Sequence, residues 1–260
     1  MAPHLEQVSG VIMNLSRPRR MPALALLLAV LIPSRVDAAG DVALNGGAYV
    51  LVDLSASYFH PSTMNVMDST LSQVNEILLE LVGKWPSPFS FHFLPIGEAG
   101  LTSPALCEGV FRSSLFKRNR AAAEDGTRLL HDRDELARHL DNCKILILNQ
   151  APRQLTDISG SIDLAQRMSR AQSRGPKTLI IISDFAEDRS PEAYSGELDL
   201  NGFSVIMIYR LQSASPKQQR EIDRNLKHWS QNFRKAGAKG VSSILESGPF
   251  VNFVLREILE

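Results

Sequence analysis

Three short polar segments of the sequence carry oxygen ligands of the kind that hold a divalent cation. They are 53–57 (DLSAS), the threonine in 155–158 (LTDI) and 183–184 (SD). The D-x-S-x-S spacing lets one turning loop aim a carboxylate and two hydroxyls inward, because alternate residues can face the same way. The candidate ligands are Asp53, Ser55, Ser57, Thr156 and Asp184. Since the set contains only hard oxygen donors and no His or Cys, it favours Mg²⁺ or Mn²⁺ over Zn²⁺.

Short apolar runs predict the strands that would position these ligands. The expected strands are 48–52, 90–96, 144–148, 178–182 and 203–209. The nearly continuous apolar character of 48–52 is typical of a central strand that is covered on both faces. Pro95 restricts the second strand to an edge, or places the proline at a strand end, because proline has no backbone N–H to donate.

Between these runs the apolar residues recur with a helical period. The expected helices are 67–82, 133–140, 158–172, 216–236 and 251–259. Strands that alternate with helices predict a three-layer α/β fold, a doubly wound and mostly parallel sheet with helices on both faces. In such sheets ligands bind outside the carboxyl ends of the strands, near the reversal of strand order. Asp53 and Asp184 each follow a predicted strand, and Thr156 follows the predicted strand 144–148, so we expect all three to meet there.

These three segments, in this order and beside these strands, resemble the von Willebrand factor type A (VWA) domain family. The resemblance extends from about Gly47 to the C-terminus. It implies a Rossmann-like sheet with one short antiparallel edge strand, for which 109–116 is the candidate segment. It also implies a metal-ion-dependent adhesion site in which Ser55, Ser57 and Thr156 are direct or water-mediated ligands. Asp53 and Asp184 would hold the metal and its waters, and a carboxylate of a partner protein would complete the shell.

The first 38 residues have the pattern of a signal peptide. Basic residues precede the apolar run 23–32 (ALALLLAVLI), and small residues follow it at 36–39 (VDAA). The apolar run is about half of the roughly 20 residues that a membrane-spanning helix needs. We therefore expect cleavage after Ala38, a single domain over 39–260, residence in the periplasm or outside the cell, and no stable membrane span in the mature chain. An uncleaved N-terminal anchor is the alternative.

Charge and cysteine content narrow the class of protein further. The chain has 28 basic and 28 acidic side chains, so no basic surface for nucleic acid is implied. Its cysteines are Cys107 and Cys143. An oxidising compartment favours a disulfide between them, and two free buried thiols are the alternative. Both cysteines lie within the long polar segment 97–143, which is either a partner-binding insertion or a surface excursion pinned by the disulfide.

The leading functional hypothesis is a non-enzymatic module that binds a protein partner through the metal. A metal-dependent hydrolase or phosphotransferase is a second hypothesis, because some phosphatases place a nucleophilic aspartate after the first strand, as with Asp53. Such enzymes place a second aspartate where this chain has Ser55, and the sequence contains no phosphate-binding loop or nucleophile elbow. A third hypothesis is a scaffold domain whose metal site is vestigial.

The first segment is followed by three aromatic residues, Tyr58, Phe59 and His60. They would either form a rim of the site or pack beneath it.

Overall fold

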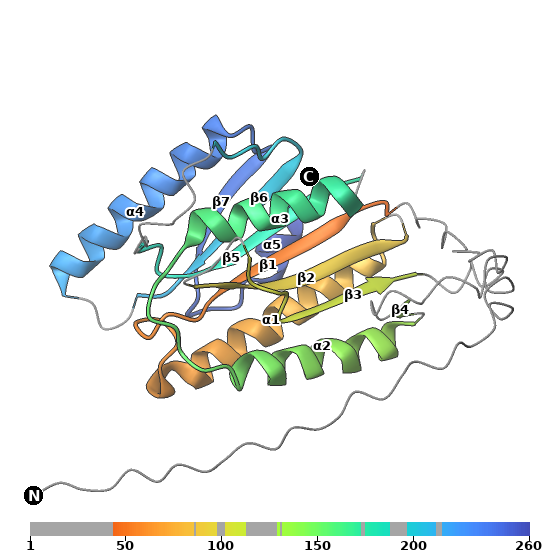
Figure 1. Ribbon diagram of the computed structural model, residues 1–260, viewed down its shortest axis with the longest axis horizontal. Helices are drawn as coiled ribbons and strands as arrows, with labels where there is room; N and C mark the ends of the chain where they lie inside the picture. The colour runs from red at the N-terminus through yellow and green to blue at the C-terminus, as the bar shows by residue number, and fades with distance from the viewer. Residues whose placement is uncertain are drawn as a thin grey trace, which may run out of the picture. The chain divides into compact units, whose positions relative to one another are not determined.

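A seven-stranded β-sheet forms the centre of the part of the chain that the structure describes (Figure 1). This computed structural model describes residues 44–85, 87–97, 102–112, 129–130, 132–172, 175–187, 197–211 and 215–260. The strands are β1 (Gly47–Asp53), β2 (Phe89–Ile96), β3 (Cys107–Phe111), β4 (Leu129–Leu130), β5 (Lys177–Ile182), β6 (Phe203–Tyr209) and β7 (Gly240–Leu245). The predicted signal peptide and its cleavage site lie outside the described residues.

The strand order is β4-β3-β2-β1-β5-β6-β7, and neighbouring strands are parallel except for the antiparallel pair β2 and β3. From β1 the chain adds β2, β3 and β4 on one side of the sheet. It then crosses back to pair β5 with the other side of β1, and β6 and β7 follow beyond β5. The reversal therefore falls between β1 and β5, whose carboxyl ends are Asp53 and Ile182. This confirms the predicted doubly wound, mostly parallel sheet and places its switch point at the candidate ligands.

Helices cover both faces of the sheet, as predicted. They are α1 (Met64–Val82), α2 (Arg133–Leu148), α3 (Ile158–Gln172), α4 (Pro216–Lys235) and α5 (Val251–Leu259), with a 3₁₀ turn, η1 (Pro61–Thr63), before α1. Alternate residues of β1 point to opposite faces, so Val50 packs with α1, α2 and α5, while Leu51 packs with α3 and α4. Figure 1 shows α1 and α2 on one side of the sheet and α3 and α4 on the other. Two apolar cores thus sandwich the strands.

The predicted strand 144–148 is wrong, because these residues are the last turns of α2. The helix begins after Asp132, whose carboxylate accepts a hydrogen bond from Glu135 N at 2.7 Å and so caps the first turn. Its buried side chains recur at helical spacing, namely Leu136, Leu140, Cys143 and Ile147. Ile145 and Leu146 remain 54% and 51% exposed, so an apolar run that reads as a buried strand is in fact half solvated. Periodicity over five residues does not distinguish a buried strand from the end of a helix.

Other differences lie near the edges of the sheet. The antiparallel strand is β3, which overlaps the candidate segment 109–116 but lies one place inside the edge, because β4 pairs with it. β7 was not expected, since an edge strand with polar residues has a weak apolar pattern. Pro95 lies near the end of β2, beyond the last residue that pairs with β3, Phe93. The strand-end alternative is therefore correct for this proline.

A disulfide joins Cys107 at the start of β3 to Cys143 in α2, as predicted. It ties the strand to the helix that packs on it. Among the described residues no helix is both long enough and apolar enough to cross a membrane.

Candidate metal centre

Asp53 is the last residue of β1, and its carboxylate is completely buried at the switch point of the sheet. Its Oδ1 accepts a hydrogen bond from Ser55 N at 2.8 Å, and its Oδ2 accepts one from Ser183 Oγ at 2.6 Å. Two segments that are far apart in the sequence therefore hold one carboxylate from both sides. This fixes the direction in which Asp53 presents its oxygens.

Burial raises the pKa of Asp53 to about 6. The next cause is the nearby negative charge of Asp184, which also raises the pKa, while the hydrogen bonds from Ser183 and Ser55 lower it. Desolvation and a like charge both disfavour the ionised carboxylate. The structure thus brings the two predicted carboxylates close enough to repel each other, an arrangement that a divalent cation would relieve.

Ser55 and Ser57 bring their hydroxyls together in the turn that follows β1. Their Oγ atoms lie 3.1 Å apart. The turn is closed by backbone hydrogen bonds to Ser55 O from Tyr58 N at 3.1 Å and from Phe59 N at 2.7 Å. Ser55 is buried and Ser57 is exposed, so the pair of hydroxyls leads from the buried carboxylate toward the surface.

Thr156 reaches this edge of the sheet by a different route from the one predicted. No strand carries it; instead the loop after α2 forms an isolated parallel bridge between Arg153 and Ser55. Arg153 N donates to Leu54 O at 2.7 Å, and Ala56 N donates to Arg153 O at 2.9 Å. Thr156 follows three residues later and is buried. Among the described residues its side chain makes no hydrogen bond with the other candidate ligands.

Asp184 follows β5 and lies partly exposed in a tight turn. Its Oδ1 accepts a hydrogen bond from Ala186 N at 2.9 Å. The next residue, Phe185, has a φ of 59°, a left-handed conformation that is uncommon for a bulky residue. Phe185 is buried, and its carbonyl accepts a hydrogen bond from Trp229 Nε1 at 3.3 Å. Packing of Phe185 therefore holds the strained turn that presents Asp184.

Ser183 and Arg153 take part in this arrangement although sequence reasoning did not select them as site residues. Ser183 lies beside Asp184 in the third segment, so its position could have pointed to the site. A serine next to an aspartate is too common in sequences, however, to indicate a site residue. Its hydroxyl also accepts a hydrogen bond from Phe185 N at 2.9 Å. Nothing in the local sequence indicates that Arg153 pairs with the first segment.

A buried ion pair contacts Tyr58, in the loop that follows β1. Arg210 Nε and Glu246 Oε2 are 2.6 Å apart. Glu246 also accepts hydrogen bonds from Tyr58 at 3.1 Å and from Thr70 at 2.6 Å. The guanidinium of Arg210 lies over the Tyr58 ring, 4.5 Å from its centroid. Burial, followed by the charge of Glu246, raises the pKa of Tyr58 well above its ordinary value.

Tyr58 and Phe59 are 1% and 2% exposed, so the expectation that they pack beneath the loop is correct, although Tyr58 also lines the pocket beside the site. His60 is exposed and caps the 3₁₀ turn before α1, where Ser62 N donates to its Nδ1 at 3.2 Å. The aromatic residues after the first segment are therefore structural supports of the loop.

A pocket of about 310 Å³ adjoins the site on the side of α4. Ser57 and Asp184 line it together with residues of α4, namely Gln218, Glu221, Ile222 and Asn225. The residues present fit a hard divalent cation, because the buried Asp53 and the partly exposed Asp184 repel each other and the hydroxyls of Ser55 and Ser57 lie in the adjoining turn. The pocket gives an outside group access to this position.

No family model matches the sequence. No curated protein is similar to it either. Solved structures similar to this one include proximal thread matrix protein 1 from the mussel byssus, at 11% identity and a TM-score of 0.43 over 84% of this chain and 46% of that chain. A von Willebrand factor type A protein from Catenulispora acidiphila is 12% identical, with a TM-score of 0.41 over 83% of this chain and 42% of that one. The pilus adhesin SpaC from Lactobacillus rhamnosus GG, in an open conformation, is 8% identical, with a TM-score of 0.44 over 84% of this chain and 30% of the adhesin. The chain therefore spans less than half of the length of each of these structures.

Proposed function

We propose that this domain binds Mg²⁺ or Mn²⁺ through Asp53, Ser55, Ser57, Thr156 and Asp184 and uses the cation to hold an acidic group of a protein partner. The observation that carries the proposal is that Asp53 is buried at the switch point of the sheet within electrostatic reach of Asp184; burial, followed by the charge of Asp184, raises the pKa of Asp53 to about 6. A bound cation would supply a positive centre with a coordination position left for a carboxylate from outside. The proposed function corresponds to an adhesion-type VWA domain.

The role of each residue in this proposal follows from its surroundings. Asp53 is fixed by two hydrogen bonds and is buried, so it suits an anchoring role. Ser57 and Asp184 line the 310 Å³ pocket, so they are the candidate ligands nearest to an incoming partner group. The α4 wall of the pocket would contact whatever surrounds that group and would contribute to the choice of partner.

The burial of Asp53 favours binding over the hydrolase hypothesis. A nucleophilic carboxylate needs a free oxygen that faces the substrate, whereas both oxygens of Asp53 accept hydrogen bonds and the residue has no exposed surface. We therefore propose a non-enzymatic role. Export through the predicted signal peptide to the periplasm or the cell exterior is part of the same proposal, and the disulfide between Cys107 and Cys143 suits either compartment.

Thermal unfolding with and without metal tests the proposal. We expect Mg²⁺ or Mn²⁺ to raise the melting temperature above that in EDTA, and Asp53→Ala and Asp184→Ala to abolish the rise. Asp141→Ala, which removes an exposed carboxylate on α2, is the matched control and should keep it. Equal melting curves in EDTA and in metal would remove the metal site from consideration.

A pulldown with the immobilised protein separates an interaction module from a scaffold. We expect a partner that is retained in Mg²⁺, released by EDTA and not retained by Asp184→Ala. Metal-dependent stabilisation without any metal-dependent partner would instead favour the scaffold hypothesis.

A further inference from the structure

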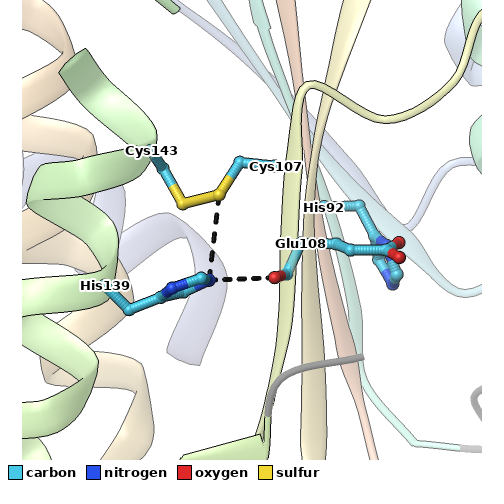
Figure 2. Close-up of a disulfide and its surroundings, with 5 residues drawn as sticks. All are labelled: His92, Cys107, Glu108, His139 and Cys143. Atoms are coloured by element: carbon cyan, nitrogen blue, oxygen red, sulfur yellow. Dashed lines mark hydrogen bonds and ion pairs between the residues drawn. A yellow bond between two sulfur atoms is a disulfide. The ribbon is translucent and has the colours of Figure 1, made fainter. Parts of the chain in front are cut away.

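A second group of metal-ligating side chains lies away from the oxygen site, between β3 and α2. Figure 2 shows the disulfide of Cys107 and Cys143 with the ring of His139 pointing toward it. The distance from Cys107 Sγ to His139 Nε2 is 3.8 Å. The ligand atoms of the three residues all lie within 4.8 Å of one another. Two sulfurs and an imidazole nitrogen are the ligand types that Zn²⁺ prefers.

The fold holds these side chains in place. His139 and Cys143 are four residues apart in α2, so they share one face of the helix. Cys143 is completely buried and His139 is 9% exposed. The histidine ring packs edge-on against Phe91, with ring centroids 5.8 Å apart, and its Nε2 lies 2.9 Å from the carbonyl oxygen of Glu108. The packing against Phe91 would be kept in a metal site, whereas the contact of Nε2 with the Glu108 carbonyl would be exchanged for the metal.

The separation between the Cys107 sulfur and the His139 nitrogen is close to that of a tetrahedral zinc site. With Zn–S bonds of about 2.3 Å and a Zn–N bond of about 2.05 Å, a tetrahedral site separates sulfur from nitrogen by about 3.6 Å and the two sulfurs by about 3.8 Å. The Cys107–His139 separation of 3.8 Å therefore needs to change by only a few tenths of an ångström. The sulfurs would have to move apart, which requires that the bond between them is broken.

We propose that reduction of the Cys107–Cys143 disulfide converts this cluster into a Zn²⁺ site with Cys107, Cys143 and His139 as ligands. Two thiol molecules supply two electrons and two protons, so the disulfide becomes two cysteine thiols and the reductant becomes a disulfide. Binding of Zn²⁺ then displaces the two thiol protons. His139 binds through Nε2 with its proton on Nδ1, and Nε2 gives up its contact with the Glu108 carbonyl. Water fills the fourth position.

The reaction is accessible from solvent on one side. Cys107 is partly exposed, whereas Cys143 is buried, so Cys107 is the residue of the pair that a reductant reaches from solvent. Thiolate and imidazole ligands select Zn²⁺, whereas the carboxylates and hydroxyls near Asp53 select Mg²⁺ or Mn²⁺. The new site is therefore distinct from the oxygen site in ligand chemistry and in its dependence on the thiol state.

His92 offers a matched control. It lies in β2, and Figure 2 shows that its side chain, together with that of Glu108, lies on the opposite side of β3 from the disulfide. His92 is 1% exposed, and its Nδ1 is 3.0 Å from Glu108 Oε2. It is thus another buried histidine beside the same strand, but it does not point at the sulfurs.

The test is metal titration of the full-length protein in its oxidised and reduced forms. A phosphine serves as the two-electron donor, because thiol reductants compete for the metal. Co²⁺ is the spectroscopic probe, since thiolate coordination gives charge-transfer absorption and tetrahedral geometry gives intense visible bands, and Zn²⁺ should displace it. Circular dichroism of each form reports whether the fold is kept.

We expect the charge-transfer and tetrahedral bands of one Co²⁺ per reduced chain, and none of these bands from the oxidised chain or from the Cys107→Ser/Cys143→Ser variant, because Co²⁺ held at the oxygen site has no thiolate ligand. His139→Gln, which can still donate to the Glu108 carbonyl, should weaken binding by roughly 100-fold or more, since loss of a ligand should cost at least as much as loss of a supporting contact. His92→Gln and Asp53→Ala should bind as the wild type does. Failure of the reduced protein to bind, equal binding by His139→Gln, or loss of secondary structure on reduction would each overturn the proposal.

Discussion

The hydroxyl of Ser183 donates a 2.6 Å hydrogen bond to Oδ2 of Asp53, across 130 residues of sequence. This contact joins the ends of β5 and β1, the two strands that flank the switch point of the sheet. The same hydroxyl accepts a hydrogen bond from Phe185 N at 2.9 Å. Ser183 therefore connects the buried carboxylate of the candidate site to the strained turn that presents Asp184.

Replacement of Ser183 should affect both stability and metal binding. Ser183→Ala removes a hydrogen bond to a carboxylate and leaves the Phe185 N–H without its acceptor, so we expect a loss of about 1–3 kcal/mol in the free energy of unfolding. Metal affinity should fall as well, because only the hydrogen bond from Ser55 N would then orient the Asp53 carboxylate. Urea unfolding and a Mg²⁺ titration measure the two effects.

Ser161→Ala is the matched control for that experiment. Ser161 is completely buried and donates to the carbonyl oxygens of Pro95 and Asp157 rather than to a candidate ligand. It should lower stability and leave metal affinity unchanged. If the two variants lose metal affinity equally, the contact between Ser183 and Asp53 has no particular role at the site.

The raised pKa of Asp53 predicts a specific pH dependence of stability. The group has a pKa of about 6 in the folded protein, above its ordinary value of 3.8, so ionisation is harder in the folded state than in the unfolded state. In metal-free protein its stabilising contribution should be fully present below about pH 4 and be lost as the pH rises through about 6, with a total of at most about 3 kcal/mol. Unfolding curves of the wild type and Asp53→Asn in EDTA, between pH 4 and 7, measure this contribution as their difference.

Bound metal should reverse the dependence. A cation favours the ionised carboxylate, so stabilisation by Mg²⁺ should grow as the pH rises from 4 to 7. A metal effect of constant size over this range would contradict the assignment of Asp53 as a ligand.

The buried pair of Arg210 and Glu246 should contribute strongly to stability. Their side chains are 7% and 1% exposed, so Glu246→Gln leaves a buried guanidinium without its counter-charge and should cost roughly 3–5 kcal/mol. Arg256→Ala is the control, because its partner Glu257 is 3.8 Å away and the arginine is 58% exposed; it should cost less than about 1 kcal/mol. Chemical unfolding of both variants provides the comparison, and similar small losses would show that the buried pair is not required.

The disulfide should stabilise the domain through the loop that it closes. Cys107 and Cys143 are 36 residues apart, which corresponds to about 4 kcal/mol in the chain-entropy model. Cys107→Ser/Cys143→Ser should lose about this amount in urea unfolding under oxidising conditions. Added reductant should lower the stability of the wild type without affecting the variant; sensitivity of both to the reductant would point to another cause.

The α4 wall of the pocket should affect the partner but not the metal. Glu221 and Asn225 line the pocket beside Ser57 and Asp184. Glu221→Ala and Asn225→Ala should change partner retention in the Mg²⁺ pulldown while the Mg²⁺-dependent rise in melting temperature stays at the wild-type value. Loss of that rise would place these residues in the metal site itself.

The sequence by itself determined the elements whose pattern is long or unambiguous. The apolar runs that became β1, β5 and β6 are continuous enough to specify buried strands, and the helical period specified α3 at the same bounds as in the structure. From these elements the α/β class follows, as does the position of Asp53 and Asp184 at strand ends. Such patterns are local, since they depend on which faces of an element are buried.

Only the tertiary structure decided which distant groups meet. The segment 144–148 became helix because it continues the buried face of α2, and Thr156 arrives through the bridge between Arg153 and Ser55 rather than from a strand. The contacts of Ser183 with Asp53 and of Tyr58 with Glu246 join residues 130 and 188 positions apart. A local pattern records burial but not the identity of the partner, and a hydrogen bond or ion pair exists only once the sheet order has brought both partners to the same edge.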